Sequence, residues 1–116
     1  MRVENVKVFD MRNNNVTLLN EPTKEMFKDI PICIQEESDF SKENPLHNIY
    51  PIGVVDCDTV VKSGDEYFAT VETFPKGFDI NEFEFFNYSF DAKNRNVENN
   101  TCEIGNVCNI IYRKSK

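Results

Sequence analysis

Two runs rich in β-branched and aromatic residues, 50–61 and 66–73, constrain the fold of this chain more than any other feature. They lie on either side of the turn Lys62-Ser63-Gly64-Asp65. In the second run, successive side chains alternate between two faces, as expected of a strand with one buried face. A short turn that contains glycine between two such runs is typical of a β-hairpin. The pattern therefore predicts a hairpin in the middle of the chain.

Short strands are also expected along the rest of the chain. Residues 3–9 and 16–19 suit a first hairpin around an Asn-rich turn, and 102–113 suits a final strand. Residues 83–90 carry aromatic side chains at both sets of alternate positions, which predicts a central strand covered on both faces. The segment 22–30 suits one or two helical turns, because it begins with a proline and a second proline follows it.

The length of 116 residues indicates one domain, 1–116, with a single core. Ten phenylalanines and four tyrosines can fill that core, since each buried aromatic side chain removes about 150–250 Å² from water. We predict a mainly β (β-rich α+β) fold, a compact antiparallel barrel or sandwich of six to eight short strands with one short helix. An acidic loop over 35–48 and a short basic tail over 113–116 are expected outside the core.

The chain has a net charge of −7 and an isoelectric point near 4.7. Direct nucleic-acid binding is not expected, because it depends mainly on Lys and Arg side chains that neutralise phosphates. Membrane binding is not expected either, since the charge is unfavourable and no apolar run approaches the roughly 20 residues that span a bilayer. With no apolar signal segment at its start, we expect a cytoplasmic protein of a bacterium or infected host cell, or a component of a phage particle. One alternative is an inhibitor whose acidic surface mimics nucleic acid.

The four cysteines, Cys33, Cys57, Cys102 and Cys108, lack the close pairing of structural zinc sites. In a reducing compartment we expect buried free thiols. The sequence Asp56-Cys57-Asp58 would place two carboxylates on one face of a strand, where they could bind a divalent cation, but we favour the solvent side of a half-buried strand. No glycine cluster suits a phosphate, so neither a metal nor a cofactor is predicted.

His47 is the only histidine of the chain, so any mechanism that needs a histidine base depends on it. Serine and cysteine nucleophiles are available, but the sequence does not show which of them lies close to His47. A single loop histidine is more often solvated than catalytic. From the spacing alone we favour no catalytic residue.

A longer pattern runs through residues 26–90. His47 precedes the segment Pro51-Ile-Gly-Val-Val55, and the hairpin that follows ends in Tyr67-Phe-Ala-Thr-Val71. Together with the preceding Phe27-Lys-Asp-Ile-Pro-Ile32, these residues resemble the barrel of phage prohead maturation proteases.

In that family a histidine precedes such a strand, and a serine nucleophile lies on a later strand of the same barrel. The resemblance implies His47 and Ser89 as the catalytic pair of a small serine protease-like domain. Glu98 or Glu103 would be the third member, although neither lies in a recognisable motif. We accordingly expect a related barrel of phage origin without activity.

The segment after residue 81 offers a surface for binding another protein. It combines acidic and aromatic side chains at Glu82, Phe83, Glu84, Phe85, Phe86 and Tyr88. Such aromatic residues are more often core, but apolar patches with a charged rim also mark protein interfaces. We therefore predict a non-enzymatic protein-interaction module, phage- or bacterium-encoded, that acts in a particle or by occluding a host protein. The partner is expected to be a protein, and self-association is left open.

Overall fold

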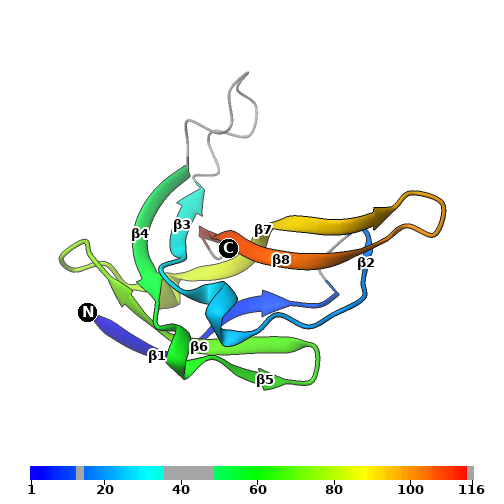
Figure 1. Ribbon diagram of the computed structural model, residues 1–116. Helices are drawn as coiled ribbons and strands as arrows, with labels where there is room; N and C mark the ends of the chain where they lie inside the picture. The colour runs from blue at the N-terminus through cyan, green and yellow to red at the C-terminus, as the bar shows by residue number, and fades with distance from the viewer. Residues whose placement is uncertain (13–14, 36–48, 115–116) are drawn as a thin grey trace.

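The computed structural model describes residues 1–12, 15–35 and 49–114. Eight strands in these ranges belong to one sheet, and three single-turn 3₁₀ helices connect some of them (Figure 1). The strands are β1 (Arg2–Asp10), β2 (Thr17–Leu18), β3 (Pro31–Gln35), β4 (Ile49–Val55), β5 (Val61–Ser63), β6 (Glu66–Thr73), β7 (Phe83–Asn96) and β8 (Thr101–Lys114). The 3₁₀ helices are η1 (Lys24–Phe27), η4 (Cys57–Thr59) and η5 (Ile80–Glu82).

The sheet runs in the order β1-β6-β4-β3-β8, with β5 beside β6, and with β2 and β7 beside β8. The predicted β-rich fold is confirmed, but the sheet is mixed rather than wholly antiparallel, because β2 and β3 both pair with β8 in parallel. Long connections permit parallel pairing, which short hairpins exclude. Among the described residues no backbone pairing joins β1 to β7, so the sheet does not close into a barrel there.

The expected hairpin between 3–9 and 16–19 does not form. β1 pairs instead with β6, so that Arg2 lies opposite Glu72, and β2 pairs with β8. Both partners are far away in the sequence, and local alternation carries no information about such pairings.

The hairpin around Gly64 is confirmed, with β5 and β6 as its arms. Gly64 takes a φ of +64°, which glycine adopts readily. The predicted first arm, 50–61, is broken into β4 and β5 by η4. Asp56 caps η4 by accepting a hydrogen bond from the Asp58 backbone N–H, so Asp56-Cys57-Asp58 is a helical turn and not part of a strand.

The prediction of a central strand over 83–90 is wrong. β7 pairs only with β8 among the described residues, and a β-bulge explains its aromatic pattern. Phe85 lies opposite Tyr112 and Asn87 opposite Ile111, which leaves Phe86 as the extra residue. One inserted residue reverses the alternation, so aromatic residues on both sides of the bulge point to the same face. An edge strand with one apolar face therefore resembles, in sequence, a strand buried on both faces.

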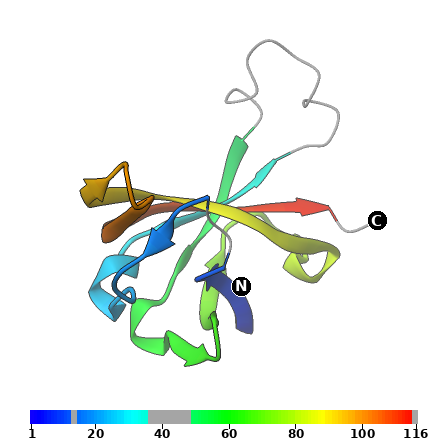
Figure 2. The same cartoon turned by 90° about the vertical axis from the view of Figure 1, so that its right-hand side faces the viewer.

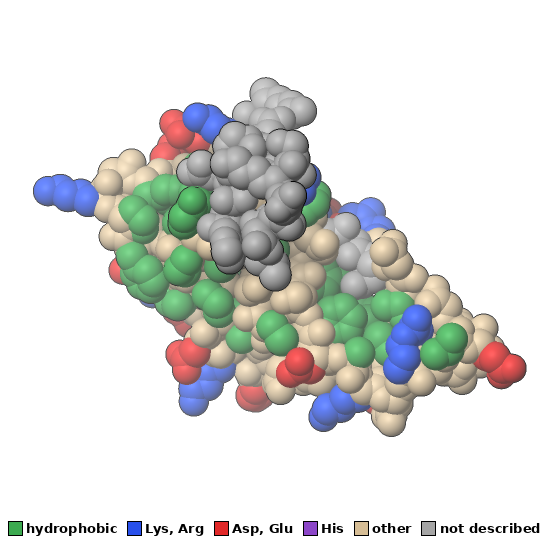
Figure 3. All heavy atoms as spheres, turned by 90° about the horizontal axis from the view of Figure 1, so that it is seen from above, with side chains coloured by type: hydrophobic (Ala, Val, Ile, Leu, Met, Phe, Trp, Pro, Cys, Tyr) green, Lys and Arg blue, Asp and Glu red, His purple; other side chains and the backbone are tan. Residues whose placement is uncertain are grey.

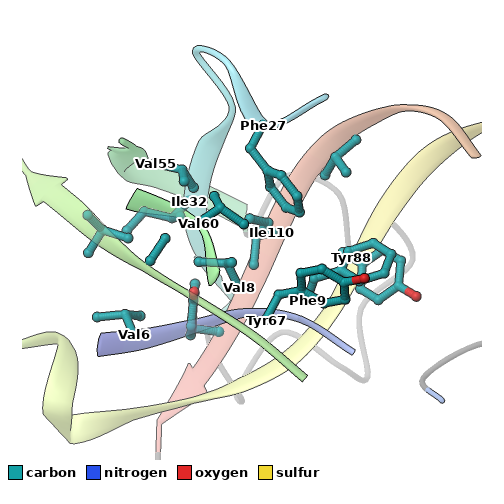
Figure 4. Packing of buried hydrophobic residues seen from close by; sticks show 14 of the residues in the cluster. Val6, Val8, Phe9, Phe27, Ile32, Val55, Val60, Tyr67, Tyr88 and Ile110 are labelled. Carbon is teal, nitrogen blue, oxygen red and sulfur yellow. The ribbon is translucent and has the colours of Figure 1, made fainter. Parts of the chain in front are cut away.

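The core lies between the two layers formed by the curved sheet (Figure 4). Phe9 is its aromatic centre, with its ring in contact with those of Phe27, Tyr67 and Tyr88. Two of these rings meet Phe9 edge-to-face, an arrangement that aromatic pairs favour. Aliphatic side chains from β1, β3, β4, β6 and β8 complete the core, among them Val8, Ile32, Val55, Val71 and Ile110.

The acidic loop predicted over 35–48 lies outside the described residues, except for Gln35 at the end of β3. The predicted tail begins later than expected, since Arg113 and Lys114 belong to β8. Arg113 is partly buried and donates hydrogen bonds to the Gln35 side chain, which fixes it to the sheet.

Candidate functional site

The two edge strands β1 and β7 approach each other across the open side of the sheet, and we call the gap between them the seam. Figure 2 shows the long β7–β8 hairpin running across the molecule above β1. Two tyrosine hydroxyls reach β1 from the β7–β8 hairpin: Tyr88 of β7 donates to the carbonyl oxygen of Asp10 at 2.9 Å, and Tyr112 of β8 donates to that of Lys7. The Tyr88 side chain therefore joins β1 to β7, two strands that no backbone pairing connects in the described part of the chain.

Two hollows open along the seam. The first has a volume of about 420 Å³, and we call it the seam groove; its lining includes Asn5, Lys7, Phe68, Ile80, Phe83 and Phe85. The second, of about 430 Å³, lies beside it and shares Lys7 and Phe85. The groove thus combines aromatic and aliphatic side chains with polar groups, and more of its exposed lining is polar than apolar.

The polar edge of the seam is built around Asp10, which is 6% exposed. Its carboxylate accepts hydrogen bonds from Arg12 and from Lys7 Nζ, the latter at 2.8 Å. The Arg12 bonds, with those of Lys7 and against the opposing effect of burial, hold the pKa of Asp10 well below its usual range. Partial burial opposes the charge on Lys7, but hydrogen bonds to Asp10 and Glu66 outweigh it and raise the pKa of Lys7.

The four aromatic residues predicted to bind a partner divide into three groups. Phe83 and Phe85 are half-buried and line the seam groove. Phe86, the bulge residue, is 38% exposed, and its ring lies 3.2 Å from the guanidinium carbon of Arg113. Tyr88 is 6% exposed and belongs to the core, so its ring cannot form part of a surface.

The two glutamates predicted at the edge of this surface are exposed. Glu82 ends η5, and Glu84 lines the seam groove on β7. The turn of η5 is capped by Asp79, whose carboxylate accepts a hydrogen bond from the Asn81 backbone N–H at 2.9 Å. This cap turns the chain into β7 and so places both glutamates beside the groove.

The opposite wall of the groove was not predicted from the sequence. Asn5 stands within β1 at a φ of +59°, where a bulge shifts the register between Val3 and Val6. An asparagine inside an otherwise alternating strand is a signal for such a bulge, since asparagine tolerates left-handed backbone. That β1 would lie opposite β7 had no sequence signal, because the two strands do not pair.

The catalytic pair implied by the protease resemblance stays a prediction. Ser89 lies on the exposed face of β7 and donates a hydrogen bond of 2.7 Å to the Asn109 side chain. His47 lies outside the described residues, so the structure does not relate it to Ser89. Glu98, one of the two candidates for the third member, is exposed in the β7–β8 turn. Glu103, the other candidate, accepts a hydrogen bond from the Asn94 side-chain amide.

The cysteine and acidic side chains that the structure describes do not gather into a metal site. Within the described ranges, no group of three or more Cys, His, Asp or Glu side chains could hold a metal ion. Cys33 and Cys102 are buried, as predicted, whereas Cys57 is half-buried and Cys108 is exposed. The Asp56 carboxylate instead accepts a hydrogen bond of 2.8 Å from the guanidinium of Arg2.

A second apolar area involves Met1, Tyr50 and Phe74, which are the exposed large hydrophobic residues near the β6–β7 connection. Phe74 is 63% exposed and donates its backbone N–H to Ile52. Seen from above, hydrophobic side chains gather at this end of the molecule (Figure 3, left).

The fold and the seam define a small β-rich domain with one open sheet and an aromatic groove between its edge strands. In the described part of the chain, no helix has the length and apolar character needed to cross a bilayer. Comparisons of the chain with models of protein families, with curated proteins and with solved structures found no match.

Proposed function

We propose that this protein is a non-enzymatic interaction module that binds a segment of another protein in the seam groove. The observation that carries the proposal is the position of Phe83 and Phe85, which line an open groove on an edge strand while remaining half-buried. Partly buried aromatic side chains with a polar surround are the usual anchors of protein interfaces.

Neighbouring side chains hold the aromatic residues of the groove in place. The Asp10 cluster fixes Lys7, whose Nζ lies 5.0 Å from the centre of the Phe85 ring. Phe78 stacks on Phe83 with their ring centres 5.1 Å apart. Both aromatic walls are therefore held by neighbours before any partner binds, which reduces the entropy lost on binding. Action within a phage particle, or by occlusion of a host protein, belongs to the same proposal.

Site-specific photo-crosslinking tests this proposal. A photoreactive residue at position 84, inside the groove, is expected to give a discrete crosslinked product in a bacterial lysate. The same residue at position 25, which is exposed on η1 away from the seam, serves as the matched control and is expected to give none. Equal labelling from both positions, or no product from position 84, would contradict the proposal.

Truncation of the aromatic wall identifies the residues that bind. We expect Phe83→Ala to abolish the crosslink from position 84, because it removes an anchor of the groove. Phe74→Ala removes the same side chain from an exposed site outside the groove and is expected to leave the crosslink unchanged. Circular dichroism and thermal melting of both variants check that the fold is retained. A folded Phe83→Ala protein that still crosslinks would exclude the groove.

A further inference from the structure

The open sheet has two long edges, β1 and β7, at which no described strand continues the backbone pairing. An edge strand presents backbone N–H and C=O groups that can pair with a strand of another chain. β1 is prone to such pairing, because its segment Val6-Lys-Val-Phe9 is rich in β-branched and aromatic residues. A protein with this edge must block it in order to stay unassociated.

The other edges of the sheet have features that discourage pairing. β2 and β5 contain only two and three residues, so they are too short to bind a strand. β4 carries Pro51 in the part that extends past its pairing with β6. The outer half of β7 includes Lys93 and Arg95, and several register shifts interrupt its ladder with β8. Short strands, edge prolines, edge cations and bulges all oppose the addition of another strand.

The edge of β1 is blocked in a different way, by tyrosine hydroxyls of the β7–β8 hairpin. Tyr112 donates to the backbone carbonyl of Lys7, and Tyr88 donates to that of Asp10 at 2.9 Å. Both carbonyls therefore point across the seam, where an added strand would need them as acceptors. The two tyrosines are only 2% and 6% exposed, so a strand that displaced their hydroxyls would leave buried donors without acceptors.

The backbone and one side chain of β1 oppose pairing at the same edge. Two register shifts against β6 interrupt β1, one at Asn5, whose φ is +59°, and one just after Lys7. Bulges of this kind break the regular spacing of edge groups and increase the local twist. The Lys7 side chain also crosses the edge, with its Nζ 5.0 Å from the centre of the Phe85 ring. Three independent features thus act on one edge.

We propose that the Tyr88 and Tyr112 hydroxyls, together with the bulges of β1, protect the edge of β1 from pairing with the β1 edge of a second copy. A second copy is the partner to be excluded, because every molecule in solution carries the same edge. Two identical edges pair antiparallel about a two-fold axis and so bring no mismatch of sequence. The inference is independent of the proposed function, since it concerns the backbone edge of β1 and not the occupant of the seam groove.

Sedimentation velocity of the Tyr88→Phe/Tyr112→Phe variant tests this inference. Each substitution removes a hydroxyl but keeps the ring, so the two β1 carbonyls lose their donors while the core stays filled. We expect the average mass of the variant to rise with concentration from 13.5 kDa, the mass of one chain, toward twice that value. Wild type is expected to stay at the mass of one chain. A folded double variant that also stays at this mass would overturn the inference.

Val55→Ala is the matched control for lost stability. Val55 is buried in β4, which β6 separates from β1, so its truncation destabilises the fold without releasing the β1 carbonyls. We expect this variant to remain a single chain. Association of Val55→Ala to the same extent as the double variant would show that destabilisation alone causes association, and would overturn the inference. Circular dichroism checks that each variant is folded.

Hydrogen exchange locates the contact between the associated chains. In the associated double variant, the amides of residues 2–10 are expected to exchange more slowly than in the dilute, dissociated variant. Protection confined to other strands would overturn the inference. Tyr88→Phe and Tyr112→Phe alone each release one carbonyl and are expected to associate more weakly than the double variant. These single variants decide the test if the double variant is poorly folded, and the absence of association in both would then overturn the inference.

Discussion

At the scale of single residues, Asp10 does the most to hold the seam in place. Its carboxylate accepts a hydrogen bond from the Arg12 backbone N–H at 2.8 Å, which turns the chain at the end of β1. The same carboxylate binds the Arg12 guanidinium and Lys7. Lys7 in turn contacts the Phe85 ring. One buried carboxylate therefore fixes both the end of β1 and a wall of the groove.

Replacement of Asp10 by asparagine is expected to lower the free energy of unfolding by roughly 1.5–3 kcal/mol at neutral pH, because charged hydrogen bonds are lost. The pKa of Asp10 is lower in the folded protein than in the unfolded chain, where it is near 4. Its contribution is therefore complete above that value and is lost as the pH falls below it. Urea denaturation of both proteins at several pH values measures the difference.

The difference between wild type and Asp10→Asn should be constant from about pH 5 to pH 7 and should shrink below about pH 4. Asp58→Asn, at an exposed acid outside the seam, is the control and should have little effect. A difference for Asp10→Asn that stays the same at pH 3 would show that the charge of Asp10 does not stabilise the fold.

At the scale of strands, bulges decide which side chains face the core. β7 has extra residues at Phe86 and between Lys93 and Asn96, and β8 gains extra residues relative to β7 near Gly105 and Cys108. These insertions change the spacing of inward residues on β8, so that Ile104, Val107 and Ile110 are all buried although they lie three apart. The buried residues of β8 therefore share one face of the strand, although buried positions do not recur at every second residue of its sequence.

The hydroxyls of Tyr88 and Tyr112 link β1 to the β7–β8 hairpin and can be removed with little change of side-chain shape. Tyr88→Phe and Tyr112→Phe are each expected to lower the free energy of unfolding by about 0.5–1.5 kcal/mol, because each leaves a β1 carbonyl without its hydroxyl donor. Tyr50→Phe removes a hydroxyl from an exposed tyrosine and should cost almost nothing. Denaturation curves of the three variants compare them directly, and equal costs at all three positions would exclude a role for the bridges.

At the scale of the whole molecule, the sheet is assembled from partners that are distant in the chain. Arg2 lies opposite Glu72, and Gln35 lies beside Arg113. Few of these pairings can form until long loops have closed, and the entropy of closure is lost before the contacts stabilise the fold. The seam likewise lies between distant parts of the chain, because it separates β1 from β7.

We expect refolding of this protein on the order of milliseconds to seconds, as for other β-rich domains with non-local pairings. The chain has four tyrosines and no tryptophan, so tyrosine fluorescence in a stopped-flow instrument can follow the reaction. Complete refolding within microseconds would contradict the importance of distant pairings.

The sequence alone predicted the features whose causes are local. The turn at Gly64 and the helical turn before Pro31 both depend on backbone preferences of a few adjacent residues, and the structure has each of them. Composition also predicted the β-rich class, because aromatic and β-branched residues favour strands. The acidic and aromatic segment 82–88 was also singled out from the sequence, and its role in binding a partner stays a prediction.

Only the tertiary structure decided which strands meet and which side chains share a face. Strand pairing depends on contacts between distant residues, and a bulge at Phe86 or Asn5 reverses the alternation on which strand predictions rest. For this reason Tyr88 became a core residue, while Phe83 and Phe85 came to line the groove. The sequence pattern did not predict that β1 forms the other wall of the groove, because β1 and β7 meet through side chains across an open seam.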